Sequence, residues 1–245
     1  MNRARRYPPP RRPGDTFDRD AAMITVHHLN NSRSQRILWL LEELGLEYEV
    51  KRYERDKTTM RAPASLREVH PLGKSPVITE GKTTVAESGA IFEYLIEKHG
   101  EGRLIPAAGS KARLRYSYWL HFAEGTAMPP LVMKLVFNRI ESGPMPFFVR
   151  PIAKKISATV KQSFIDPELK QQLDYMEAEI STTGWFAGKE FSAADIQMSF
   201  PLEAAASRGG LGVGHPKLSD FLARIHARDA YQRALTRGGT YELLR

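Results

Sequence analysis

Polar side chains that could take part in chemistry lie at three points in the first hundred residues, each beside a predicted strand or helix. Ser32 follows a turn, the run Lys74-Ser75-Pro76 precedes a strand, and the pair Glu87-Ser88 begins a helix. The chain has no cysteine, which excludes disulfides, C-x-x-C redox pairs, cysteine nucleophiles and thiolate zinc sites. Any sulfur chemistry must therefore use the thiol of another molecule.

Two further groups of polar residues are predicted to take no part in chemistry. The seven histidines show no shared helical spacing and no paired carboxylate motif, so we expect no metal site. Ser192 and Asp195 stand three residues apart at the start of a predicted helix, where each can satisfy the other's backbone N–H. We assign this pair to folding.

The elements that must position these residues begin with a strand, a helix and a second strand. Residues 24–29 are rich in strand formers. Ser32 and Gln35 form a capping box, and the apolar residues that follow keep helical spacing until Gly45 ends the run. Residues 48–53 read as a second strand. The short connection after the helix indicates a right-handed β-α-β unit.

A loop, a hairpin and a helix complete this part of the chain. Residues 55–70 are polar and predict a loop with a short, irregular helix. Residues 76–79 and 83–85 surround a glycine-containing turn and predict a hairpin. Ser88 can cap a helix that Gly100 closes. The order β-α-β, loop, β-β-α is a thioredoxin-like layout.

Beyond residue 110 the sequence shows helical patterns only. A long periodic segment runs from residue 111 to about residue 140 and should be kinked or interrupted by Pro129-Pro130. Further helices are predicted from Pro151 onward and over residues 166–180, 193–207 and 217–235. The fold class is therefore α/β plus all-α.

These patterns divide the chain into four predicted parts. Residues 1–22 form a basic tail rich in proline and arginine, which we expect to be disordered because it has little to bury. A thioredoxin-like domain (23–103) and a short linker (104–110) follow. Residues 111–245 form an all-helical domain.

Composition and charge exclude some classes of protein. No apolar run approaches the roughly 18 residues of a membrane-spanning helix, so we expect a soluble protein without a membrane partner. The net charge is +8. Six Arg and three Asp within residues 1–22 leave an excess of +5, which we interpret as spread along the chain and suited to attracting small anions. Nucleic acid is the weaker alternative.

Four segments together resemble the soluble glutathione transferases, in their bacterial and fungal-like forms. HLNNSRSQRILWLLEELGL at 28–46 is similar to the family's first strand, turn and helix. PLGKSPV at 71–77 and ESGAI at 87–91 match its next two motifs in order and spacing. GKEFSAADI at 188–196 resembles the motif of its helical domain. The resemblance covers residues 23–245 and leaves only the tail aside.

The resemblance implies that Ser32 is the catalytic residue. In the family, a hydroxyl after the first strand donates a hydrogen bond to the glutathione sulfur and favours thiolate over thiol. Lowering a thiol pKa of about 8.5 by two units needs about 2.7 kcal/mol, and a charge-assisted hydrogen bond of about 1.5–3 kcal/mol beside a helix N-terminus supplies it. Ser32 is equally suited to capping the helix, and Asn31 or Ser34 is near enough to be the donor instead. No tyrosine stands here, so a serine-type or atypical site is implied.

The resemblance also implies which residues bind glutathione. Pro76 would be the family's cis-proline, which presents the backbone of Ser75 to the cysteinyl part of glutathione. Lys74 would pair with a glutathione carboxylate; otherwise it is simply solvated. The Ser88 hydroxyl and the free N–H groups of its helix would bind the γ-glutamyl carboxylate, while Glu87 meets the ammonium group. Ser88 as a plain helix cap is the alternative.

The function implied is that of a glutathione transferase. Glutathione would be the cosubstrate, activated as thiolate to attack a small, mostly apolar electrophile in a detoxification reaction. The resemblance further implies a cytoplasmic homodimer. A glutathione-dependent peroxidase, dehalogenase or isomerase on the same fold is one alternative, and a non-catalytic binding module is another. The presence of Pro76, Glu87 and Ser88 argues against the module, which need not keep all three.

Overall fold

The computed structural model of the chain describes residues 22–207, 210–212 and 214–244. The predicted tail at 1–22 lies outside the described residues except for Ala22. The first part of the described chain contains four strands and three helices. Their bounds are β1 (Ile24–Leu29), α1 (Ser34–Leu44), β2 (Tyr48–Tyr53), α2 (Leu66–Val69), β3 (Val77–Glu80), β4 (Thr83–Ala86) and α3 (Ser88–His99).

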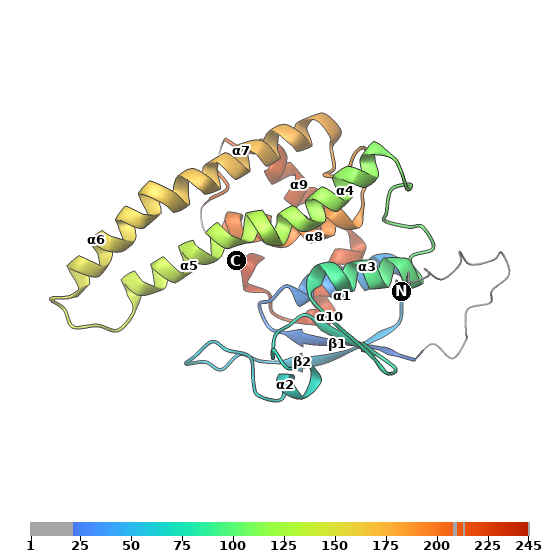
Figure 1. Cartoon of the computed structure of the whole chain (residues 1–245), viewed down its shortest axis with the longest axis horizontal. Coiled ribbons are helices and arrows are strands. Elements are labelled where there is room, and N and C mark those ends of the chain that lie inside the picture. Colours follow the sequence, from blue (N-terminus) through green and yellow to red (C-terminus); the bar gives the residue numbers. More distant parts are fainter. Residues whose placement is uncertain (1–21, 208–209, 213, 245) are drawn as a thin grey trace, which may run out of the picture.

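The four strands form one sheet in the order β2-β1-β3-β4. β1 and β2 are parallel, with Ile24 opposite Tyr48, and β3 is antiparallel to both β1 and β4. Helices α1 and α3 cover the face of the sheet that is turned to the helical half, and α2 lies on the other side, where Leu66 packs on Leu29 and Tyr53 (Figure 1). The predicted thioredoxin-like layout is confirmed.

Helices make up the second half of the described chain. They are α4 (Lys111–Phe122), η1 (Ala123–Ala127), α5 (Met128–Ser142), α6 (Arg150–Val160), η2 (Lys161–Ile165), α7 (Asp166–Thr183), α8 (Ala193–Ser207), α9 (Pro216–His226) and α10 (Asp229–Gly238), followed by a 3-10 turn, η3 (Glu242–Leu244). No helix within the described ranges is both long enough and apolar enough to cross a bilayer.

The predicted interruption of the long helix lies just before its prolines. The π-helical turn η1 separates α4 from α5, and Pro129 and Pro130 stand in the first turn of α5. A proline has no N–H for the helical ladder, and its ring clashes with the carbonyl four residues earlier, so the irregular backbone falls in the preceding turn. The predicted helix at 217–235 is two helices instead, α9 and α10, with a break at Ala227–Arg228.

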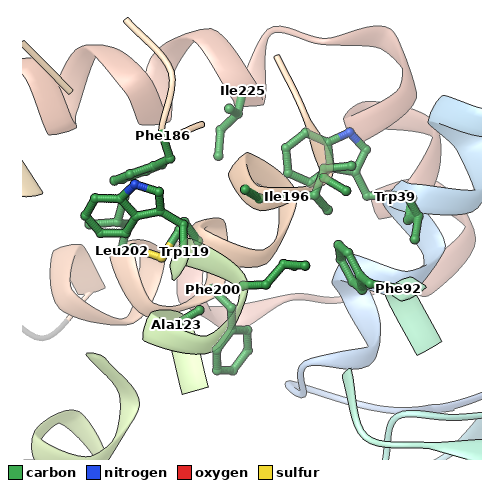
Figure 2. Close-up of a cluster of buried hydrophobic side chains, with 14 of the residues drawn as sticks. Trp39, Phe92, Trp119, Ala123, Phe186, Ile196, Phe200, Leu202 and Ile225 are labelled. Carbon is green, nitrogen blue, oxygen red and sulfur yellow. The ribbon is translucent and has the colours of Figure 1, made fainter. Parts of the chain in front are cut away.

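Both halves of the chain share one hydrophobic core. Helix α8 is buried from Ala193 to Ala205, as expected of a helix that is apolar on all sides. Trp39 and Phe92 come from the sheet-containing half and join Trp119 and other side chains of the helical half in one cluster (Figure 2). The sheet-containing half therefore depends on α8 for part of its core.

The end of the chain returns to the sheet-containing half. Helix α10 packs along α1, and Arg237 Nη2 donates a hydrogen bond of 2.5 Å to the Tyr48 carbonyl of β2. Farther on, the Glu242 N–H donates to Asn31 Oδ1 at 2.8 Å. The turn between β1 and α1 is thus held by residues more than two hundred positions later in the sequence.

The predicted structural role of Ser192 and Asp195 is confirmed with one difference. The Asp195 carboxylate accepts hydrogen bonds from the N–H groups of Phe186 and Ser192, both at 2.8 Å. The Ser192 hydroxyl donates to that carboxylate at 3.0 Å and does not bind the Asp195 N–H, which bonds to the Ser192 carbonyl. Asp195 therefore fastens the start of α8 to the preceding loop.

Replacing Asp195 by alanine should lower the free energy of unfolding by about 2–4 kcal/mol, because two buried N–H groups would lose their acceptor. Urea denaturation followed by circular dichroism measures this difference. Glu190→Ala, at an exposed position of the same loop, is the control and should change stability little. Equal stability of the two variants would contradict the assigned role.

Candidate functional site

Five of the six predicted site residues line a single cleft of about 200 Å³. The cleft lies between loops of the sheet-containing half and the turn η1 of the helical half. Its lining consists of Arg33, His70, Leu72, Lys74, Ser75, Pro76, Ala86, Glu87, Ser88 and Glu124. The sixth predicted residue, Ser32, precedes Arg33 in the chain but is buried and does not belong to this lining.

Ser75 and Pro76 line the cleft just before β3. The peptide bond between them is cis, as expected. The Ser75 hydroxyl donates to the His27 carbonyl at 2.8 Å and accepts a hydrogen bond from the Leu29 N–H at 3.3 Å. The side chain of Ser75 thus links the loop to β1 by two hydrogen bonds. The backbone N–H and C=O of Ser75 are the groups that can bind a ligand.

Glu87 and Ser88 stand at the N-terminus of α3. Glu87 is exposed and has a φ of 74°, in the left-handed region that residues other than glycine rarely adopt. Such backbone strain is often found where a site is built. No side chain caps α3, so the free N–H groups of its first turn and the positive end of its dipole face the cleft and favour an anion.

Arg36 lies directly behind the cleft and joins four elements. Its side chain is 1% exposed, and its Nη1 donates to the Gln197 carbonyl of α8 at 2.6 Å. Its Nη2 donates to the Ser88 hydroxyl at 3.0 Å and pairs with Glu124 Oε1 of η1 at 2.5 Å. Burial lowers the pKa of Arg36, and the carboxylate of Glu124 opposes this effect.

The bond from Arg36 also fixes the hydrogen-bonding role of Ser88. A guanidinium has donors only, so the Ser88 oxygen is the acceptor in this pair. The hydroxyl proton of Ser88 therefore stays available for an anion in the cleft. The positive charge behind Ser88 strengthens such a bond.

Ser32 takes part in a buried chain of hydroxyl groups. Its Oγ lies 2.7 Å from the Oγ of Ser34 and accepts a hydrogen bond from the Ser34 N–H at 3.3 Å. The Ser34 Oγ lies 2.8 Å from Nδ1 of His28. The capping box with Gln35 predicted from the sequence does not form, since no side chain caps α1.

His28, which follows Ser32 and Ser34 in this series of hydrogen-bonded side chains, determines which group donates in each bond. Burial, with a smaller contribution from Arg52, lowers the pKa of His28 to about 4, so the ring is neutral at pH 7. A hydrogen bond between the ring and the backbone of Gly238 raises the pKa of His28 slightly against these effects. Because Nδ1 faces Ser34, we assign Nε2 as the ring nitrogen that donates to Gly238. Ser34 then donates to Nδ1, and Ser32 donates to Ser34.

Sequence reasoning missed several residues of this site. Arg36 lies within a run from Ser34 to Leu41 that is buried throughout, and a charged side chain in an apolar helical pattern is a signal that could have drawn attention to it. Glu124 and His70 line the cleft from segments that carry no recognisable motif. Their contribution depends on tertiary packing.

Comparison with known proteins gives the family. Residues 21–97 match the family description "Glutathione S-transferase, N-terminal domain", and residues 142–229 match "Glutathione S-transferase, C-terminal domain". The chain is 35% identical over 217 residues to Glutathione S-transferase 1 of Saccharomyces cerevisiae, an alignment that covers 85% of this chain and 92% of the relative. The chain belongs to the glutathione S-transferase family.

Two further relatives agree with this assignment. Glutathione S-transferase 3 of Schizosaccharomyces pombe is 39% identical over 184 residues, which cover 75% of this chain and 74% of the relative. The crystal structure of a glutathione S-transferase from Actinobacillus pleuropneumoniae superposes with a TM-score of 0.73 at 30% identity, covering 91% of this chain and 96% of the other. The resemblance seen in the sequence motifs is confirmed, and the protein is a transferase of the family whose cosubstrate is glutathione.

The cleft of this transferase is formed mainly by one of the two matched regions. Every lining residue except Glu124 falls within residues 21–97. Glu124 comes from η1, between the two matched regions. The helical half therefore contributes to the cleft through Glu124, which the ion pair with Arg36 holds in place. Arg33 makes a second ion pair with Glu124, with its Nε 2.9 Å from Oε2.

Glu124→Gln should lower the free energy of unfolding at pH 7 by about 2 kcal/mol, because Arg36 would remain buried without its counter-ion. The cost is smaller than for a fully buried pair because the Glu124 side chain is partly exposed. Burial alone would raise the pKa of Glu124, but Arg36 and Arg33 lower it below the ordinary value of 4.5. A carboxyl group whose pKa is lowered by folding stabilises the fold at pH values above its ordinary pKa. This stabilisation is lost as the pH falls through the pKa of the group in the folded protein.

The difference between wild type and Glu124→Gln should thus be constant above pH 4.5 and narrow below it, as measured by urea denaturation at a series of pH values. Glu179→Gln removes a more peripheral ion pair, with Arg115 at 2.7 Å, and serves as the control, with an expected cost below about 1 kcal/mol. A pH-independent difference would argue against the assigned electrostatics.

Proposed function

We propose that this transferase binds glutathione in the cleft between Arg33 and Glu87 and transfers it to an electrophilic second substrate. The observation that carries the proposal is the convergence of Lys74, Ser75-Pro76 and Glu87-Ser88 on one cleft that also receives a helix N-terminus. These groups complement the charges of glutathione, which carries two carboxylates and one ammonium group.

The γ-glutamyl end of glutathione is the part best matched by the site. Its carboxylate would accept hydrogen bonds from the Ser88 hydroxyl and from the free N–H groups at the start of α3. Its ammonium group would meet the Glu87 carboxylate. The Arg36 contact at 3.0 Å leaves the Ser88 proton free for this purpose.

The rest of the tripeptide would extend along the cis peptide bond toward β1. The backbone of Ser75 would pair with the cysteinyl unit, because the Ser75 hydroxyl is already bound to His27 and Leu29. The exposed Lys74 would pair with the glycyl carboxylate. This orientation directs the sulfur to the turn before α1.

Thiol activation would come from the hydroxyl of Ser32. The thiol loses its proton to solvent, and the Ser32 O–H donates to the resulting thiolate, which forms a carbon–sulfur bond with the electrophile as the leaving group departs. To reach the sulfur, the Ser32 hydroxyl must turn away from Ser34 and give up the 2.7 Å bond. The Ser34 hydroxyl continues to donate its hydrogen bond to Nδ1 of His28. Ser32 is therefore the hydroxyl that can turn toward the sulfur.

The family resemblance supports the remaining parts of the proposal. We take the second substrate to be a small apolar electrophile, and the enzyme to be a cytoplasmic homodimer. Exposed apolar side chains on α4 and α7 offer one surface for association, namely Leu114, Tyr118 and Tyr175.

Glu87→Gln should weaken glutathione binding about 10-fold or more, because the substitution removes the charge that faces the ammonium group while keeping the side-chain shape. Isothermal titration with glutathione measures the loss. Glu101→Gln is a matched control, since Glu101 is also exposed and also has a positive φ, 50°, but lies outside the cleft. Unchanged affinity of the Glu87 variant would contradict the proposed orientation.

Ser32→Ala should raise the pKa of the bound glutathione thiol by about one to two units, the effect of losing a charge-assisted hydrogen bond. Ultraviolet absorbance of the thiolate in the enzyme complex, followed against pH, measures it. Ser34→Ala should leave this pKa low, because it removes only the group that holds the Ser32 proton away from the sulfur. If Asn31→Ala or Ser34→Ala raises the pKa and Ser32→Ala does not, the donor is assigned wrongly.

Two assays separate transferase chemistry from the alternatives on this fold. Conjugation to an aryl halide reports carbon–sulfur bond formation, and reduction of an organic hydroperoxide reports peroxidase activity. Retention on immobilised glutathione without either activity would favour the non-catalytic module and overturn the proposed reaction.

A further inference from the structure

The basic excess of the chain is concentrated in two segments. Residues 1–22 carry a net charge of +3, and residues 128–165 carry six lysines and arginines against Glu141 alone, a net charge of +5. All other residues together are neutral. The interpretation that the charge beyond residue 22 is spread along the chain is therefore wrong.

The second basic segment is a projecting pair of helices. Residues 128–165, here called the α5–α6 hairpin, comprise α5, α6 and η2, and Figure 1 shows them extending away from the rest of the molecule. The main contacts of α6 are with α5 and η2. Among the eleven residues of α6, Ser157 is the one that is buried. The hairpin thus has almost no core of its own beyond its base.

Large apolar side chains are exposed along the whole hairpin. Phe147 and Phe148 at its tip are 85% and 66% exposed. The other exposed members of the hairpin are Val132, Val136, Ile140, Ile152, Ile156 and Phe164. A concentration of exposed apolar surface on one projecting element marks a site of interaction.

Basic side chains lie beside this apolar surface. Ile152 and Ile156 are four residues apart and share one face of α6; Lys155, three residues after Ile152, borders that face, and Lys154 lies on the opposite side of the helix. Neither lysine forms an ion pair with any residue in the described part of the chain. A helix with an apolar face, unpaired lysines beside and opposite that face, and aromatic residues at its end has the character of a helix that lies in a lipid interface.

The combination of charge and apolar surface selects one partner among three. A second copy packed hairpin against hairpin would bring two segments of net charge +5 together, and these repel each other. A nucleic acid would match the charge but leave Phe147 and Phe148 in water. An anionic lipid surface matches both, because headgroups attract the basic residues and the acyl region accepts the phenyl rings.

We propose that the α5–α6 hairpin docks this protein onto an anionic lipid surface, with Phe147 and Phe148 inserted below the headgroups. The contact is peripheral and needs no spanning helix. It revises the expectation that the protein has no membrane partner. It does not depend on glutathione or on the proposed chemistry.

The test is flotation of the full chain with vesicles of phosphatidylcholine, with and without phosphatidylserine. The protein should float only with the anionic vesicles, and less at high salt. Phe147→Ser/Phe148→Ser should weaken binding at least tenfold by removing both rings. Lys154→Gln/Lys155→Gln should weaken it roughly 25-fold, at about fivefold for each basic residue near an anionic surface.

Matched controls lie outside the hairpin. Met23→Ser changes an apolar side chain that is 50% exposed just before β1, and Lys57→Gln/Lys82→Gln changes two exposed lysines; both should float like wild type. Three results would overturn the proposal: no binding of wild type to phosphatidylserine vesicles, undiminished binding of the phenylalanine variant, or controls that lose as much binding. Conversion of a dimer to a monomer by the phenylalanine variant, seen by sedimentation velocity without vesicles, would assign the hairpin to a second copy instead.

Discussion

The buried guanidinium of Arg36 is the interaction on which both the fold and the cleft depend. Its charge lies on α1, in the sheet-containing half, but its partners are the Gln197 carbonyl of α8 and the carboxylate of Glu124 in η1. A charge removed from water must be paired and hydrogen bonded, or its burial is costly. The two halves of the chain therefore cannot separate at this point without exposing or stranding a charge.

The same guanidinium connects this constraint to ligand binding. Arg36 donates to Ser88 at the start of α3, so the group that joins the halves also orients a hydroxyl at the edge of the cleft. The positive charge of Arg36, the dipole of α3 and Arg33 all raise the electrostatic potential there. Glu124 limits this potential from the other side. The cleft is suited to a ligand with both signs of charge at one end.

Much of the architecture could be predicted from local patterns, because these patterns act over a few residues. The strand at 24–29, the helix ended by Gly45 and the hairpin at 77–86 follow from propensity, capping and turn signals. The motifs at 71–77 and 87–91 likewise predicted which residues would meet in the cleft. What failed was the capping box: the hydroxyl of Ser32 bonds to Ser34, which bonds to Nδ1 of His28, and the other side of that ring bonds to the backbone of Gly238, far along the chain. No periodicity in the sequence reports such a contact between opposite ends of the chain.

The contacts made by the last helix have a consequence for the order of events during synthesis. The turn that carries Asn31 and Ser32 is made early in synthesis, but Glu242, which bonds to Asn31, and Gly238, which bonds to the nearby His28, are made more than two hundred residues later. A nascent chain can form the sheet long before it can complete this turn. The turn is thus completed only after α10 and η3 have been made, and a chain that stops before them keeps the cleft-forming motifs without these contacts.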